Sequence, residues 1–157
     1  MDTIKPVIVI ILGIVLLVVL LGMLYGTYVT WRVEHASQQA EFRAGTLPIE
    51  LPDGAYDGTS PDLERRSWHG KSFDKAKSSG LNRIGNEEKY PFVMSFGSGL
   101  RDPIKVITID YNLPENPWWL RLVTDEIVQT SPDQFLGKVH AHILGLTFSI
   151  GYFELQK

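Results

Sequence analysis

The feature that most constrains this chain is a stretch without charged residues, residues 6–31, which has Lys5 before it and Arg32 after it. From Val7 to Leu24 it consists almost entirely of Val, Ile and Leu. An α-helix needs about 20 such residues to cross roughly 30 Å of hydrocarbon, and its backbone hydrogen bonds are satisfied within the helix. The stretch therefore predicts a membrane-spanning helix.

The alternative is a cleaved signal peptide, whose apolar region is usually about 7–15 residues long and ends at a small-x-small site. This stretch is longer, and its end carries Tyr25, Tyr28 and Trp31, residue types that collect at membrane interfaces. We therefore expect an uncleaved anchor in residues 1–31, a stalk in residues 32–50 and a water-exposed domain in residues 51–157.

The charges that flank the predicted span are nearly balanced and say little about its orientation. Because a short tail before a single span usually leaves the following domain exported, we expect a single-pass protein of the inner (cytoplasmic) membrane with a periplasmic domain. Gly22 and Gly26 form a G-x-x-x-G pair. The pair either lets a second membrane helix approach closely or is simply two glycines in a membrane helix.

The composition excludes several classes of function. The absence of cysteine rules out disulfides, thiol catalysis, thiolate zinc sites and a lipobox lipid. A net charge of −3 without a Lys/Arg block argues against nucleic acid as a partner. Neither G-x-S-x-G, nor a P-loop, nor a dinucleotide fingerprint occurs, and spacing pairs no nucleophile with a base. We therefore expect no enzyme activity and no cofactor.

The clearest secondary-structure signals lie at the end of the chain. Residues 104–111, 120–130, 135–144 and 147–155 are β-branched or alternate between apolar and polar side chains. The links between the last three are short enough for hairpins, which predicts an antiparallel meander. With six to eight strands expected and no room for crossover helices, the fold should be mainly β: a small antiparallel β-barrel or a strongly bent sheet.

Short motifs follow one another over residues 51–155: Gly54-x-Tyr56-x-Gly58, Trp68-His69-Gly70-Lys71-Ser72-Phe73, Asp110-Tyr111-Asn112-Leu113-Pro114, Leu136-Gly137 and Phe153-Glu154-Leu155. This series resembles the small bacterial GXWXG proteins, in which a G-x-W-x-G strand precedes a W-x-G-K-x-F segment. The chain departs from that pattern by having Tyr56 in place of the first tryptophan and by adding the apolar stretch. The resemblance implies a lipocalin-like barrel and no particular reaction.

The candidate ligand-binding residues are aromatic residues of these motifs and one lysine: Tyr56, Trp68, Lys71, Phe73 and Phe153. The aromatic side chains either line an apolar pocket or form ordinary core. Lys71 is either the counter-charge of a ligand or a solvated ammonium on an apolar stem, and we favour the second. The glycines beside Tyr56 indicate that a backbone or ring lies close against the strand.

His140 and His142 lie two residues apart and so share one face of a strand, which would supply part of a metal site. The sequence places no third ligand beside them. Lys138 shares their face, which favours an exposed polar stripe, and we expect no metal.

Asp125 and Glu126 are adjacent on a predicted strand and therefore point to opposite faces. One of them should point inward and need a cationic partner, for which Arg121 and Lys105 are candidates.

Residues 112–119 form a proline-rich loop that ends in Trp118 and Trp119. The two indoles either dock on the bilayer or a partner protein, or Trp118 plugs one end of the barrel.

Two functions fit these features. The first is a membrane-anchored, non-enzymatic binding domain that holds a lipid or small apolar ligand in its barrel, with membrane lipid as a partner. The alternative is an accessory or structural subunit of a larger membrane protein complex, which binds other subunits through the helix and the Trp118-Trp119 loop.

Overall fold

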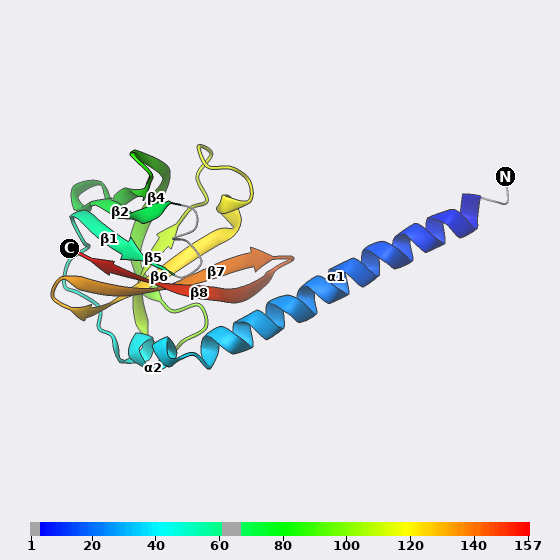
Figure 1. The fold of residues 1–157 in the computed structure, drawn as a ribbon, viewed down its shortest axis with the longest axis horizontal. Helices are drawn as coiled ribbons and strands as arrows, with labels where there is room; N and C mark the ends of the chain where they lie inside the picture. The colour runs from blue at the N-terminus through cyan, green and yellow to red at the C-terminus, as the bar shows by residue number, and fades with distance from the viewer. Residues whose placement is uncertain (1–3, 61–66) are drawn as a thin grey trace.

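A computed structural model describes residues 4–60 and 67–157 and consists of a long N-terminal helix followed by a closed antiparallel β-barrel (Figure 1). The helices are α1 (Ile4–Glu34) and α2 (Ser37–Ala44). The strands are β1 (Gly54–Thr59), β2 (Trp68–Asp74), β3 (Ser79–Ile84), β4 (Glu87–Ser98), β5 (Lys105–Asp110), β6 (Val123–Ser131), β7 (Gln134–Ile143) and β8 (Leu146–Gln156), with one-turn helices η2 (Lys75–Lys77) and η3 (Leu120–Leu122). The predicted mainly-β barrel is confirmed.

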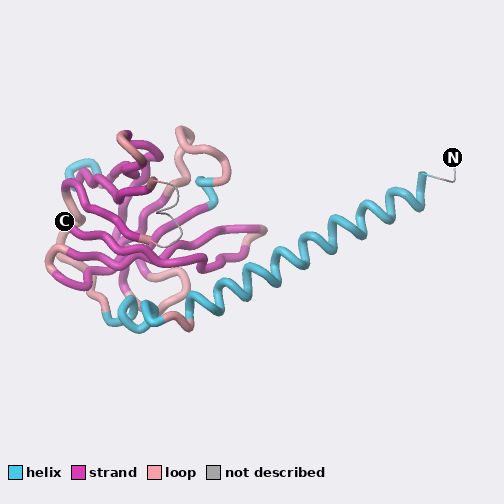
Figure 2. Tube along the Cα trace, in the orientation of Figure 1, coloured by secondary structure: helices cyan, strands magenta, loops and turns pink. Residues whose placement is uncertain are grey.

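The barrel closes because each strand pairs antiparallel with the next and β8 pairs back onto β1 (Figure 2). The predicted meander of the last three strands is confirmed, since β6–β7 and β7–β8 are hairpins. The first of the three strands begins later than predicted, because residues 120–122 form η3 instead. Each of the eight described strands therefore has a neighbour on both sides, which is how a barrel avoids exposed sheet edges.

Within residues 6–31 α1 carries no charge and is apolar on all sides, and the described side chains of its first half are exposed and project away from the barrel (Figure 1). Among the described residues, the segment Pro6–Glu34 is the one helix long and apolar enough to cross a membrane, and by length and composition it suits a membrane anchor or a signal sequence. Residues 1–3 of the predicted anchor lie outside the described residues.

The interior of the barrel holds the main hydrophobic core, which is rich in aromatic residues. Tyr56 packs edge-to-face on Phe73, with ring centroids 5.4 Å apart, and Phe73 packs in the same way on Phe92 at 5.7 Å. Edge-to-face pairs of this kind add about 0.5–1.5 kcal/mol each beyond burial of their area. These rings fill the end of the barrel at which β1 begins.

α2 covers part of the outer wall, where Phe42 joins Val106, Val128 and Leu136 in a second, smaller core. The predicted stalk thus contains a helix that packs on the barrel. The division at residues 31 and 50 itself stays a prediction.

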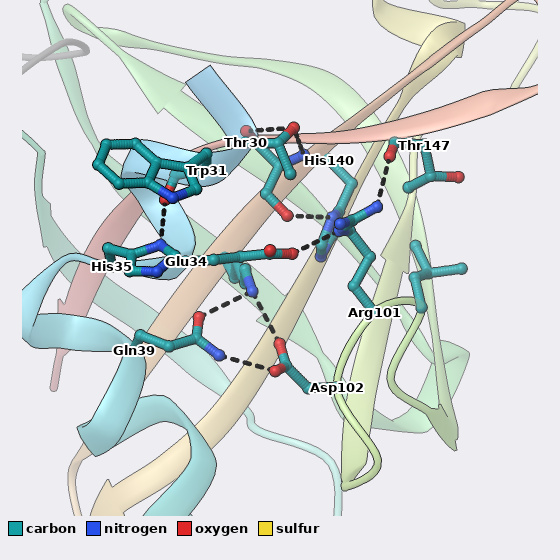
Figure 3. A network of polar contacts seen from close by, with 12 residues as sticks. Thr30, Trp31, Glu34, His35, Gln39, Arg101, Asp102, His140 and Thr147 are labelled. Carbon is teal, nitrogen blue, oxygen red and sulfur yellow. Dashed lines mark hydrogen bonds and ion pairs between the residues drawn. The ribbon is translucent and has the colours of Figure 1, made fainter. Parts of the chain in front are cut away.

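The expectation of an exposed polar stripe on β7 was wrong: Lys138 and His140 are fully buried. The end of α1 packs on β8, and α2 packs on β6 and β7, so the two helices cover this face of the sheet. Lys138 and His140 both have hydrogen-bond partners beneath them. Lys138 Nζ lies 2.7 Å from Asp102 Oδ2 and donates to Gln39 Oε1 of α2 at 2.9 Å (Figure 3). Gln39 in turn donates to Asp102 Oδ1 at 2.7 Å. A polar network therefore fixes α2 to the barrel.

Burial raises the pKa of Asp102, but the hydrogen bonds from Lys138 and Arg43 outweigh it and hold this pKa below its ordinary value of 3.8. The carboxylate therefore stays ionised at the centre of the network.

Candidate functional site

An irregularity in β2 turns both Trp68 and Lys71 into the barrel. The pairing of β2 with β3 shifts register between Trp68 and Gly70, so two residues three apart share the inner face. Gly70 adopts a φ of 128°, and a Cβ added there would lie 2.0 Å from the carbonyl oxygen of Tyr56. Only glycine fits this position, which explains the glycine in the Trp68-His-Gly-Lys motif.

The Trp68 ring lies directly on Gly58 of β1, where an added Cβ would be 2.3 Å from the indole. This contact confirms for Gly58 the prediction that a ring or backbone lies close against the glycines beside Tyr56. The prediction does not hold for Gly54, where an added Cβ would meet only the side chain of Lys157, at 3.8 Å.

Lys71 is the centre of a buried polar cluster. Its Nζ lies 3.0 Å from Asp125 Oδ2, donates to Asn82 Oδ1 at 2.9 Å, and also hydrogen-bonds the Tyr111 hydroxyl. The Tyr111 hydroxyl donates to Asp125 Oδ2 at 2.8 Å. The side chain of Lys71 is 2% exposed and that of Asp125 is 5% exposed.

Two predictions from sequence are thereby corrected. Lys71 is not a solvated surface lysine, because closure of the barrel encloses the β2 face that it shares with Phe73. Asp125 is the inward member of the Asp125-Glu126 pair, and its cationic partner is Lys71 rather than Arg121 or Lys105. The partner lies 54 residues away in sequence.

Aromatic rings surround the ammonium group. Nζ of Lys71 lies 5.0 Å from the ring centroid of Phe153, 5.1 Å from that of Tyr111 and 5.2 Å from that of Phe92. Contacts at this distance attract a cation by about 0.5–2 kcal/mol, which offsets part of the cost of removing it from water.

Burial dominates the protonation equilibria of the cluster. It lowers the pKa of Lys71, and the charge of Asp125 and the hydrogen bond to it oppose this effect. Burial together with the negative charge of Asp125 raises the pKa of Tyr111 well above its ordinary value. Tyr111 therefore stays a neutral hydroxyl.

A cavity of about 440 Å³ lies against this cluster. Lys71, Asn82, Tyr111 and Asp125 contribute its polar wall, and the remaining lining is mostly apolar and aromatic: Trp68, Ile84, Tyr90, Trp119, Leu120, Val123, Val139, Ile150 and Phe153. Its volume falls within the roughly 300–1,000 Å³ typical of small-molecule sites.

The cavity lies at one end of the barrel, as the positions of its lining residues along the strands show. Ile84 is the last residue of β3, Tyr111 directly follows β5 and Val123 is the first residue of β6, so all three mark the same end. The turn between β7 and β8 lies at that end too. The barrel is therefore packed at one end and hollow at the other.

The structure brings three of the five predicted ligand-binding residues to this cavity, namely Trp68, Lys71 and Phe153. Tyr56 and Phe73 lie in the packed half and contact each other instead. Binding by any of the five stays a prediction.

Sequence reasoning missed Asn82, Tyr111 and Asp125 as members of the site. Tyr111 lies in the Asp-Tyr-Asn-Leu-Pro motif, which was a usable signal. Nothing in the sequence set Asn82 apart.

The two tryptophans of the loop 112–119 have different environments. Trp119 lines the cavity and packs edge-to-face on Tyr90, with ring centroids 6.1 Å apart. Trp118 is 74% exposed. The alternative in which Trp118 plugs the barrel is therefore wrong, and its docking on a bilayer or partner stays a prediction.

A second arrangement on the outer wall has the residue types of a catalytic triad. His140 Nε2 lies 3.0 Å from Glu126 Oε2, and His140 Nδ1 lies 3.3 Å from Ser149 Oγ. All three side chains are fully buried, and the backbone N–H of Ser149 donates to Thr30 of α1 at 3.0 Å. The geometry gives a substrate no access to the serine, so this group joins α1 to the barrel.

His142 hydrogen-bonds Thr124 and Thr147 rather than sharing a ligand with His140. Across residues 4–60 and 67–157, no group of three His, Asp or Glu side chains is placed to hold a metal ion.

Comparison with known proteins adds little to this geometry. No family model matches the chain, and no curated protein matches it; membership of the GXWXG family is therefore not confirmed. A solved structure described as a protein from Thermomonospora curvata is similar, with 16% identity and a TM-score of 0.47 over 72% of this chain and 79% of that one. The functional argument therefore rests on the site itself.

Proposed function

We propose that this chain is a membrane-anchored, non-enzymatic binding module whose barrel holds a lipid or another small, largely apolar molecule. The observation that carries the proposal is the cavity of about 440 Å³, which has mostly apolar walls and a single cluster of buried polar groups. A few convergent polar groups in an apolar pocket are the usual composition of a small-molecule site.

The polar cluster favours a ligand with an uncharged polar end. The three protons of the Lys71 ammonium already reach Asn82, Tyr111 and Asp125, so Lys71 has no further proton for a ligand carboxylate. Both hydrogen bonds that the described residues make with Asp125 end on Oδ2. Oδ1 is therefore left to accept a hydrogen bond from a hydroxyl or amide of the ligand.

The same pairing supports a binding role over catalysis. In its charged form Lys71 has no free lone pair, and its three protons are held by Asp125 at 3.0 Å, by Asn82 and by Tyr111, so it is placed as a fixed hydrogen-bond donor rather than as a nucleophile. The cluster orients a ligand without reacting with it.

α1 would hold this module on the inner membrane of a bacterium, with the barrel in the periplasm. The uncharged, outward-facing apolar surface of α1 supports the anchoring, and Tyr25, Tyr28 and Trp31 would mark the headgroup level. Ile150 lines both the barrel cavity and a second hollow beside α1, so the binding site lies next to the anchor.

Native mass spectrometry of the full chain, released from membranes in nanodiscs, tests the binding role. We expect the wild-type chain to carry a small-molecule adduct that is extractable into organic solvent. Val139→Phe should lose the adduct, because Val139 lines the cavity beside Asp125, its cross-strand partner, and the added ring fills the space.

Val93→Phe is the matched control, since Val93 is 42% exposed outside the core and the same enlargement there leaves the cavity unchanged. A wild-type chain that carries no small molecule, or equal adducts on both variants, would contradict the proposal.

The second candidate is an accessory subunit of a larger membrane protein complex. The exposed indole of Trp118 favours it, as does the open space around Gly22, where no atom lies within 4 Å of an added Cβ. In the same mass spectra this function would appear as a second protein at fixed stoichiometry in place of a small molecule.

A further inference from the structure

The turn between β7 and β8 is an exposed apolar tip at the hollow end of the barrel. Its residues Ile143, Leu144 and Leu146 are 49%, 73% and 43% exposed. The tip, residues 143–146, carries no charged side chain. A tip of this kind in water would cost free energy, because each exposed aliphatic side chain forgoes about 1.5–3 kcal/mol of burial.

The tip lies beside the apolar part of α1 (Figure 1). A hollow of about 460 Å³ separates the two elements, with Ile143 and Leu144 on the barrel side and Val19, Gly22 and Met23 on the helix side. These helix residues belong to the uncharged stretch, residues 6–31.

Several contacts fix the angle between α1 and the barrel, so the tip cannot swing away freely. An added Cβ on Gly26 would lie 2.8 Å from Cδ1 of Phe148, which shows how closely the helix backbone approaches β8. Arg101 Nε lies 2.6 Å from Glu34 Oε1, and Arg101 also donates to the carbonyl of Thr147 at 3.2 Å (Figure 3). Because these contacts fix the barrel to α1, the residues of α1 that lie beside the tip show how deep in the membrane the tip lies.

The depth follows from helix geometry. An α-helix rises 1.5 Å per residue, so Gly22 and Val19 lie about 4.5 and 9 Å deeper along the axis than Tyr25 at the headgroup level. The tip faces this segment. Apolar surfaces of peripheral proteins reach about 5–10 Å into the same boundary.

We propose that the tip of the β7–β8 hairpin inserts into the bilayer leaflet next to α1 and is a second membrane anchor. The occupant of the tip surface is the acyl region of membrane lipid, which also fills the hollow between Leu144 and α1. Insertion is shallow, because the backbone groups of the turn need water or headgroups as partners. The inference rests on the proposed anchoring through α1.

The chain has no cysteine, so one introduced cysteine takes one label. Leu144→Cys carries an environment-sensitive fluorophore, and the full chain is reconstituted into phosphatidylcholine liposomes. We expect a blue-shifted emission that is quenched more by a nitroxide near the headgroup end of the acyl chain than by one near its terminus.

Leu146→Cys is a second label site, for which we expect the same result. It replaces the first variant if Leu144→Cys folds poorly. Asp133→Cys is the matched control, because it occupies the β6–β7 turn at the opposite end of the barrel and should report water.

The outcomes separate the two claims. If the liposomes do not carry the chain on flotation, the anchoring and the insertion both fail. If the chain floats but the labels at residues 144 and 146 emit as in water, only the insertion is overturned. A blue shift without quenching by either nitroxide would mean that protein, such as a second copy of this chain, covers the tip, and it also overturns the proposal.

Discussion

The buried pair of Lys71 and Asp125 gives the most specific prediction about the barrel. Replacing Lys71 with Met strands the carboxylate of Asp125 in the interior, and removing one partner of a buried ion pair typically costs about 3–5 kcal/mol. Asp125→Leu strands the ammonium and should cost about as much.

The double variant separates this effect from loss of packing. Replacing both charges with apolar groups leaves no buried charge, and such replacements are often neutral or stabilising. Here Tyr111 and Asn82 would each lose a hydrogen-bond partner, but neither is left unsatisfied, because Asn82 Oδ1 still accepts from Trp68 Nε1 and the Tyr111 hydroxyl still accepts from Asn82 Nδ2. We therefore expect the double variant to lose less stability than either single variant.

Guanidinium unfolding of the full chain in nanodiscs, followed by tryptophan fluorescence, measures the three differences in free energy of unfolding. The expected coupling energy between Lys71 and Asp125 is about 3 kcal/mol, at the upper end of the range for contacting residues in one network. If the two single costs simply add in the double variant, the pair is not buried and coupled as described, and the reasoning is refuted.

Three further predictions concern other parts of the molecule. Asp102→Asn should weaken the docking of α2. Burial raises the pKa of Asp102, but Lys138, Arg43 and Gln39 together lower it further, so the contribution of the carboxylate to stability is present above pH 3.8 and is lost as the pH falls below that value. The stability difference between wild type and variant should therefore shrink on acidification below about pH 4, and hydrogen exchange of the α2 amides reports it. Gly70→Ala should cost more than about 2 kcal/mol in the same unfolding assay, whereas Gly85→Ala, which has a φ of 57° but open space around it, should cost only the roughly 1–2 kcal/mol of that backbone strain; equal costs would contradict the close packing of β2 on β1. Trp118→Ala should change the free energy of unfolding by no more than about 0.5 kcal/mol, because the indole is mostly exposed, and a larger loss would show that the ring is part of the core.

The predictable part of this fold is the part set by local pattern. The uncharged residues 6–31 specify a long apolar helix, and the alternation in residues 135–144 and 147–155 specifies strands whose short link forces a hairpin. The sequence did not predict that the side chain of Lys71 points into the barrel. This direction depends on the register shift at Trp68 and Gly70, which changes the parity of the strand, and on a carboxylate on a strand far along the chain.

The buried state of Lys138 and His140 could not be read from β7 itself. Their alternation is that of an ordinary strand with one polar face. What buries them is the docking of α1 and α2 on this face, through Thr30 and Gln39, and sequence spacing does not reveal such long-range contacts. The polar residues Thr30 and Gln39 on the two helices are the partners of this face, but their positions in the sequence do not show which strand they meet.

The claim on which the rest depends is that α1 remains attached and holds the barrel at a membrane. The intact mass of the chain recovered from bacterial membranes tests it most directly. We expect the membrane fraction to contain a polypeptide that retains residues 6–31. A mature chain that begins after Trp31 and is recovered in the soluble fraction would contradict the account.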